Sequence, residues 1–112
     1  MRFALDVIAF SKHIPRTAEG QVTGRQLLRS ATSVAANYRA TGRARSRAEF
    51  YSKLSIVVEE ADETLFWLEI LMESKMVAGE ELSRLMQESR ELVFIFSASR
   101  KTARDNKTSP NH

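Results

Sequence analysis

The sequence carries a run of closely spaced arginines near residue 40. Arg39, Arg43, Arg45 and Arg47 lie close together, and Glu49 is the only acidic residue between residues 25 and 53. Guanidinium groups bind phosphates through their charge and through paired hydrogen bonds. The run is therefore a candidate contact for RNA or DNA. The alternative is that these arginines stabilise a helix C-terminus through its dipole and pair with nearby acids.

A second group of ionisable residues is the acidic run EEADE at residues 59–63. A metal site or an acid–base centre needs carboxylates that converge on one face, usually together with histidine. On a helix, Glu59 and Asp62 point away from Glu60, and the two histidines of the chain lie far from this run. The sequence therefore predicts no metal site here.

Other catalytic patterns are missing from the sequence. No histidine lies near the serines of residues 30–55, and no nucleophile-elbow motif is present. The four glycines are dispersed, so no glycine-rich loop can cradle a phosphate, and the absence of cysteine excludes disulfides and thiolate metal sites. We expect a protein that is not an enzyme and that needs no cofactor.

The composition limits the class of protein. The chain has 112 residues, 43% of them hydrophobic, with few glycines and prolines, which favours one helical domain. The N-terminus is typical of an amphipathic helix and not of a signal peptide, and no apolar run reaches the roughly 18 residues of a membrane span. We expect a cytoplasmic protein with no membrane segment.

Apolar residues recur at spacings of three and four along most of the chain, which is typical of amphipathic helices. Pro15 should end the first helix, Thr23 should cap the second, and Ser46 with Glu49 forms a capping box for the third. Short connections favour an all-α, antiparallel up-and-down four-helix bundle over residues 1–100, followed by a disordered basic tail at 101–112. The expected helices cover about residues 2–14, 24–41, 47–74 and 80–100.

The third predicted helix has two apolar faces. One face is a continuous stripe that should form the core of the bundle; its residues are Phe50, Leu54, Val57, Ala61, Leu65, Leu68 and Met72. The other face combines apolar and acidic residues and includes a tryptophan, a residue type enriched in protein interfaces. We predict that this second face joins subunits of a homo-oligomer; its residues are Ile56, Glu60, Glu63, Trp67 and Leu71. The alternative is that its apolar residues lie under loops or the first helix.

Two further patterns concern contacts between helices. The segment LVFIF at residues 92–96 is apolar on all sides, which also favours a homo-oligomer. We expect Glu60 and Glu63 to pair with arginines such as Arg39, either across helices or between subunits. A row of small and polar residues on the second helix should let a neighbouring helix approach closely; its members are Gln26, Ser30, Ser33 and Asn37.

Two long segments resemble a known family. RQLLRSATSVAANYRA at residues 25–40 and RAEFYSKLSIVVEEADETLFWLEIL at 47–71 are similar to the four-helix bundle proteins called 23S rRNA intervening-sequence proteins. The resemblance implies an up-and-down bundle that assembles into a ring, usually a homopentamer, with no established activity. Ala40 stands where the family usually has glutamate, which puts any ion pair of that glutamate in doubt.

Two classes of function remain open from the sequence. The first is a ring that binds RNA or DNA through the clustered arginines, together with the basic tail. The second is a scaffold or adaptor that binds another protein. A distantly similar bundle is an accessory protein to a reverse transcriptase, which adds a third possibility without direct nucleic-acid binding. The sequence names no target or protein partner.

Overall fold

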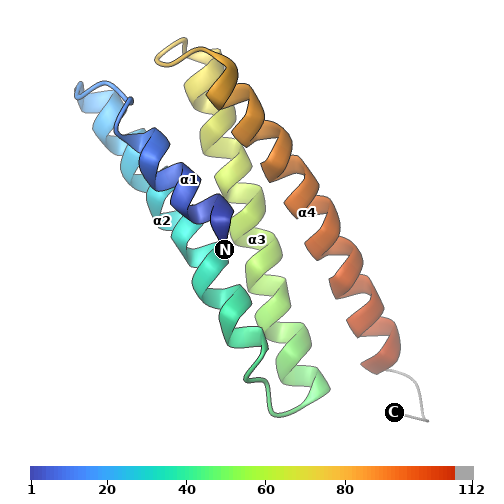
Figure 1. The fold of residues 1–112 in the computed structure, drawn as a ribbon. Coiled ribbons are helices and arrows are strands. Elements are labelled where there is room, and N and C mark those ends of the chain that lie inside the picture. The colour runs from blue at the N-terminus through green and yellow to red at the C-terminus, as the bar shows by residue number, and fades with distance from the viewer. Residues whose placement is uncertain (108–112) are drawn as a thin grey trace.

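The computed structural model describes residues 1–107, which form four helices and contain no strand. The helices are α1 (Arg2–Ser11), α2 (Ala18–Thr41), α3 (Arg47–Glu73) and α4 (Glu80–Lys107). Each helix runs opposite to the one before it (Figure 1), and the molecule measures 54 × 20 × 20 Å. The all-α prediction of four helices with short connections is confirmed.

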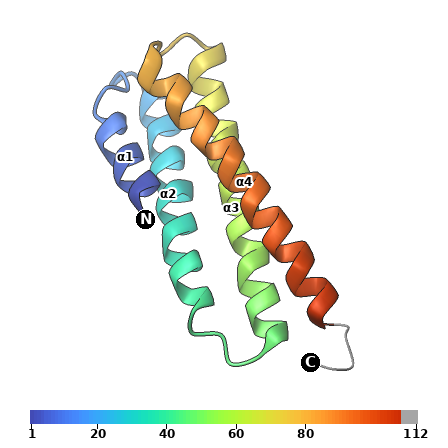
Figure 2. The same cartoon turned by 45° about the vertical axis from the view of Figure 1, so that its right-hand side comes forward.

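The short length of α1 divides the molecule into two halves. α1 packs against α2 and α4, while α3 packs against α2 and α4 from the other side. With 10 residues, α1 covers only the half that contains the α3–α4 turn (Figures 1 and 2). We call this the four-helix half. In the other half, the three-helix half, α2 and α4 are bridged by the rings of Tyr38 and Phe96, whose centroids lie 5.3 Å apart.

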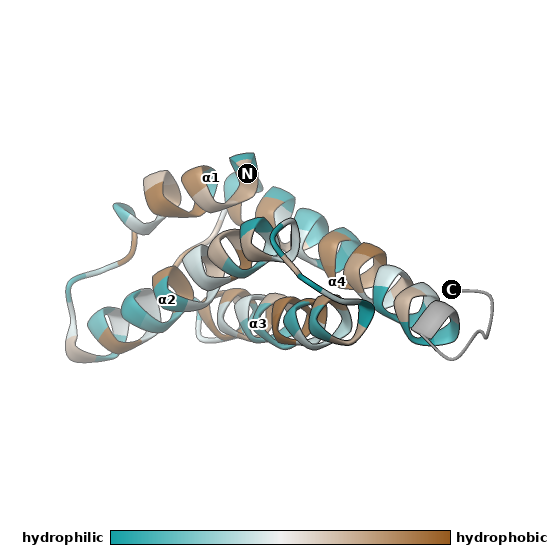
Figure 3. Cartoon of the chain, turned by 90° about the horizontal axis from the view of Figure 1, so that it is seen from below, coloured by the Kyte–Doolittle hydropathy of each residue, from teal (hydrophilic) through white to brown (hydrophobic). Residues whose placement is uncertain are grey.

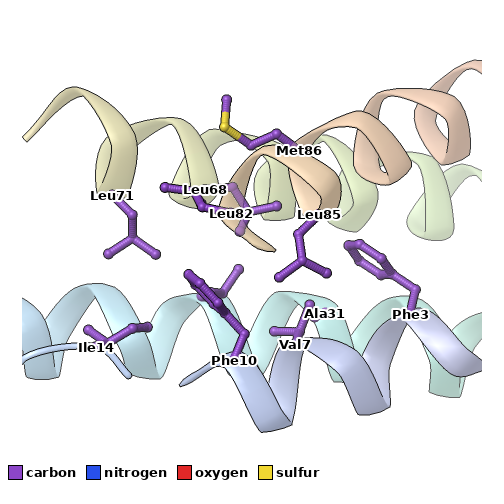
Figure 4. Close-up of a cluster of buried hydrophobic side chains, with 11 residues drawn as sticks. Phe3, Val7, Phe10, Ile14, Ala31, Leu68, Leu71, Leu82, Leu85 and Met86 are labelled. Atoms are coloured by element: carbon purple, nitrogen blue, oxygen red, sulfur yellow. The ribbon is translucent and has the colours of Figure 1, made fainter. Parts of the chain in front are cut away.

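The core of the four-helix half contains residues from all four helices (Figure 4). Leucines dominate it, and burial of each such side chain contributes about 1.5–3 kcal/mol relative to exposure. Because α1 supplies Phe3, Val7 and Phe10, it is held mainly by apolar packing. The buried members are Phe3, Val7, Phe10, Ile14, Leu27, Ala31, Leu68, Leu71, Leu82, Leu85 and Met86.

A smaller core fills the three-helix half. Its buried members come from α2, α3 and α4, with Phe50, Leu92 and Val93 packed partly buried against them. Phe96 is the largest of the buried members and closes this core on the α4 side. The buried members are Val34, Leu54, Val57, Val58, Ala61 and Phe96.

The first two helices differ from their predicted bounds. α1 ends at Ser11, and residues 12–14 form a turn closed by hydrogen bonds from the amide of His13 to Phe10 O and from that of Ile14 to Ser11 O. α2 begins at Ala18 and not near residue 24, because Thr17 is its N-cap and accepts a hydrogen bond from the amide of Gly20. The predicted cap Thr23 is buried inside the helix.

The start of α3 agrees with the sequence. The hydroxyl of Ser46 accepts a hydrogen bond from the amide of Glu49 at 3.0 Å, which confirms Ser46 as the N-cap. The helix ends at Glu73, and the turn that follows contains Lys75 with φ 61° and Gly79 with φ 119°. A positive φ is most easily adopted by glycine, so Gly79 suits the last position before α4.

α4 is longer than predicted. It continues to Lys107, so the expected tail is helical over residues 101–107, and residues 108–112 lie outside the described part. No glycine or proline interrupts residues 97–107, and basic residues near a helix C-terminus are favoured by its dipole. The absence of apolar residues therefore did not imply the absence of a helix.

Ion pairs link α1 to α4 through Arg84. Its guanidinium pairs with Glu81 and Glu88 on α4 and lies 3.5 Å from the carboxylate of Asp6 on α1. The hydrogen bond to Glu81 raises the pKa of Arg84, against an opposing effect of desolvation, and the three carboxylate charges raise it further. The fold therefore favours the charged form of Arg84. The resulting contribution to stability is fully present below the ordinary arginine pKa and is lost only in strong alkali.

No helix within residues 1–107 is long and apolar enough to cross a membrane. The cytoplasmic location stays a prediction.

Candidate nucleic-acid interface

Basic residues gather at the end of the three-helix half. This end, which we call the basic end, comprises residues 39–53 and 97–105, and Figure 3 views the molecule from this side. It contains eight basic residues and two acidic ones, whereas the rest of the chain has more acidic than basic residues. The basic residues are Arg39, Arg43, Arg45, Arg47, Lys53, Arg100, Lys101 and Arg104.

The four arginines predicted to bind nucleic acid are all exposed at this end. Arg45 is paired within its own segment, with its Nε 3.4 Å from Glu49 Oε2, yet its side chain stays 89% exposed. Among the described residues, Arg39, Arg43 and Arg47 form no ion pair. The predicted pairing with acidic neighbours therefore involves only Arg45, and three guanidinium groups are available to an external anion.

The C-terminal turns of α4 add three cations that the arginine run alone did not include. Arg100, Lys101 and Arg104 line a cleft of about 230 Å³ together with Tyr51 of α3. The cleft exists because α3 begins beside the place where α4 ends (Figure 2). A spacing of three and four residues puts these cations on one side of a helix, a signal visible in the sequence once the helix is extended beyond residue 100.

A second cleft lies between the same two helices. It has a volume of about 240 Å³ and is lined by Arg47 and Phe50 of α3 and by Ser99, Thr102 and Ala103 of α4. Its walls thus combine a guanidinium group, an aromatic ring and two hydroxyls. The sequence had identified Arg47 here, but not the part of α4 that faces it.

The acidic residues of α3 pair with an arginine, although not with the one proposed. Arg29 of α2 contacts Glu60 at 3.2 Å and also pairs with Glu63. Glu63 accepts a further hydrogen bond from the indole of Trp67 at 3.3 Å. Arg39 is not the partner within the chain, because it lies near the end of α2, about ten residues beyond Arg29, which faces Glu60. The pairing of Arg39 between subunits stays a prediction. Ala40 is half-buried.

The predicted subunit-interface residues divide into two groups. Ile56 is 43% exposed, and Glu60, Glu63 and Trp67 are partly exposed. Leu71 is fully buried in the core of the four-helix half, so the prediction of a subunit contact at Leu71 is wrong. The cause is that α3 packs against α2 as well as α4, which requires a wider buried sector than one stripe. Trp67 also packs against this core.

Met72, predicted to lie in the core, is 40% exposed instead.

Within residues 1–107, no group of three histidine, aspartate or glutamate side chains is arranged to hold a metal ion.

The fold and the sequence together identify the family. The sequence model of the 23S rRNA-intervening sequence protein family matches residues 1–98, which span all of α1, α2 and α3 and most of α4. The chain belongs to this family. The resemblance carried by residues 25–40 and 47–71 is thereby confirmed.

A solved relative has the same fold. A crystal structure of a protein of unknown function from the S23 ribosomal protein family of Bacteroides thetaiotaomicron is 33% identical in sequence, with a TM-score of 0.81. The similarity covers 89% of this chain and 93% of the other. No curated protein matches the chain.

Proposed function

We propose that the protein binds nucleic acid through the basic end. The observation that carries this proposal is that two segments distant in the sequence, residues 39–47 at the α2–α3 connection and residues 100–104 of α4, contribute cations to one end of the bundle. Phosphate contacts by arginine and lysine dominate the affinity of such proteins for RNA and DNA. The exposed guanidinium groups of Arg39, Arg43 and Arg47 supply such contacts.

The distribution of charge supports a polyanion as the ligand. The net charge of the chain is only +3, but basic residues outnumber acidic ones fourfold at the basic end. A concentrated positive potential raises the rate at which a polyanion associates and orients it toward that end. The acidic residues Glu60 and Glu63 are occupied by Arg29, so they do not neutralise the basic end.

The test replaces Arg43, Arg45 and Arg47 together by glutamine. We expect the affinity for RNA to fall at least about tenfold, which corresponds to about 1.4 kcal/mol. The plot of log affinity against log salt should lose about 0.7 in slope for each contact to a single strand. Fluorescence anisotropy of a labelled RNA at several salt concentrations measures both quantities.

A matched control separates this end from overall charge. Replacing Lys12, Arg25 and Arg90 by glutamine removes the same charge at exposed positions outside the basic end. This control should retain the wild-type affinity and salt dependence. Equal losses in the two triple variants would contradict the assignment to the basic end, and a wild-type protein that binds no RNA or DNA would refute the proposed function.

We also propose that copies of the chain associate into a ring-shaped homo-oligomer, a pentamer. Large apolar side chains on the outer surface support association: Phe94 is 75% exposed, Ile95 53% and Leu5 63%. α1 is brown along most of its length in Figure 3, since apolar residues lie on its outer as well as its buried face. A ring would repeat the basic end around an axis, and heterologous contacts close such rings.

The exposed apolar surface supports a second candidate function, a scaffold that binds another protein. Exposed apolar side chains near one another are typical of protein-binding surfaces, and Phe94 and Ile95 are adjacent on α4. The two functions differ in a measurable way. If the protein is only a scaffold, the control variant and the variant of Arg43, Arg45 and Arg47 should have the same affinity for RNA.

A further inference from the structure

Aromatic residues are placed among the cations of the basic end. Tyr38 directly precedes the basic end, near the end of α2, and Phe50 and Tyr51 lie within it, in the first turns of α3. Cationic groups interleaved with aromatic rings are typical of surfaces that bind unpaired bases, because every base can stack on a ring while its phosphate meets a cation.

Tyr38 presents an aromatic ring that the fold holds in place. Its ring lies 5.3 Å from that of Phe96 at an interplanar angle of 45°, and Phe96 is buried. Nevertheless Tyr38 remains 49% exposed. One side of the ring is therefore supported by the protein. Tyr38 is followed in sequence by Arg39, whose guanidinium forms no ion pair with the described residues.

Phe50 presents a second ring, inside the cleft of about 240 Å³ between α3 and α4. The ring packs partly buried against the core that contains Phe96, which fixes its orientation. Arg47 lies on the same cleft, as do the hydroxyls of Ser99 and Thr102. The cleft thus offers a stacking surface, a cation for a phosphate and two groups that can hydrogen-bond to a base edge or a sugar.

We propose that the basic end binds single-stranded nucleic acid, with bases stacked on Tyr38 and Phe50 and the phosphates between them held by the neighbouring arginines. This inference rests on the proposed function and adds the class of nucleic acid to it. Stacking on aromatic side chains is nearly independent of base identity, so oligouridine and oligothymidine should both bind.

A duplex does not suit this surface. Its bases are already stacked and paired, so their faces cannot reach Tyr38 or the ring inside the cleft. The basic end also consists of helix ends and a connection at residues 42–46, and not of a helix laid along a groove as in most duplex readers. Phosphate contacts alone would remain for a duplex.

The test compares two probes and two kinds of variant. The probes are a fluorescein-labelled oligouridine and a blunt RNA duplex of equal length, titrated by anisotropy at one salt concentration. Tyr38→Leu and Phe50→Leu keep apolar packing but remove the ring. We expect each to weaken binding of the single strand about fivefold or more, since stacking of one base is worth about 1–3 kcal/mol. Binding of the duplex should not change.

Two controls address other causes. Tyr38→Phe keeps the ring without the hydroxyl and should bind like the wild type. Phe66→Leu alters an aromatic residue that is also 49% exposed but lies on α3 outside the basic end, and it should bind like the wild type too. If Phe50→Leu fails to fold, Tyr38→Leu carries the test, because Tyr38 is half exposed.

The outcomes distinguish this inference from the proposed function. If Tyr38→Leu binds the single strand as tightly as the wild type, or if it loses affinity for both probes equally, stacking is refuted while the arginine contact stands. If substitution of Arg43, Arg45 and Arg47 has no effect on either probe, the proposed function fails, and the inference fails with it.

Discussion

At the scale of single residues, Ser89 is an exception in the core. Four polar residues are buried among residues 1–105. Ser30 and Thr64 donate hydrogen bonds to backbone carbonyls of their own helices, at 2.9 Å to Gln26 O and at 2.8 Å to Glu60 O. The hydroxyl of Ser89 on α4 is buried and has no hydrogen-bond partner among the described residues. A buried hydroxyl without a partner costs about 1–3 kcal/mol.

Replacing Ser89 by alanine should therefore stabilise the protein. We expect the free energy of unfolding to rise by up to about 1 kcal/mol, because the unpaired hydroxyl is removed and alanine favours the helix. Urea denaturation followed by circular dichroism measures the change. Ser30→Ala is the matched control and should lower stability by about 0.5–1.5 kcal/mol. A loss of stability in Ser89→Ala as large as that in the control would mean that its hydroxyl has a partner.

The residue scale also shows which side-chain roles a sequence can reveal. The acidic character of Glu60 and Glu63 indicated an ion pair between helices, but the partner, Arg29, depends on the relative height of α2 and α3. The direction in which Leu71 points from α3 is the same in a monomer and in an oligomer. Whether its side chain is buried depends on whether another helix of the same chain lies on that side. Periodicity gives the direction of a side chain and not the identity of what it meets.

At the scale of elements, two glycines of α2 have different roles. Gly20 lies between the first two predicted helices and Gly24 at the predicted start of the second, yet both are helical. A Cβ added at Gly20 would overlap the carbonyl oxygen of Pro15, so glycine allows the chain before α2 to pack closely on its first turn. A Cβ added at Gly24 would lie 3.6 Å from the side chain of Ile14, an ordinary packing distance.

Alanine at these two positions should therefore have opposite effects. Gly24→Ala is expected to raise the free energy of unfolding by up to about 1 kcal/mol, the usual gain for alanine inside a helix. Gly20→Ala should lower it by about 1–3 kcal/mol, because Pro15 and its neighbours must move. Thermal denaturation of both variants against the wild type tests this pair. Stabilisation by both would show that α2 does not approach Pro15 closely.

Helix existence was predictable here, but the end of α1, the start of α2 and the end of α4 were not. Ser46 identified the start of α3 because its capping partner lies three residues later. α2 begins six residues earlier than predicted because Thr17, and not Thr23, is its N-cap, and Gly20 permits close packing on Pro15. α4 continues through polar residues because it lacks glycine and proline, and Ser99, Thr102 and Ala103 lie beside α3.

At the scale of the whole molecule, the candidate site depends on long-range arrangement. The arginine run was visible in the sequence, whereas its proximity to Arg100 and Arg104 follows only from the antiparallel course of α3 and α4. The aromatic residues Tyr38 and Phe50 looked like ordinary core positions. The short α1 leaves the three-helix half without a fourth helix between α2 and α4, so Tyr38 stays 49% exposed and Phe50 is only partly buried.

The assembly is the last property that the whole chain makes testable. Light scattering coupled to size exclusion should give the mass of five chains, each of 12.7 kDa. Phe94 is the most exposed large apolar residue among those described, so Phe94→Ser removes apolar surface without disturbing the core. If α4 forms part of the subunit contact, this variant should shift the mass toward that of one chain, because loss of a buried phenylalanine at an interface costs several kcal/mol or about a hundredfold in affinity per contact.

Phe94→Leu keeps apolar contact and should retain the assembly. A wild-type protein with the mass of a single chain would refute the oligomer, whereas an unchanged assembly in Phe94→Ser would remove α4 from the contact and leave the outer face of α1, with Leu5 and Ile8, to supply it.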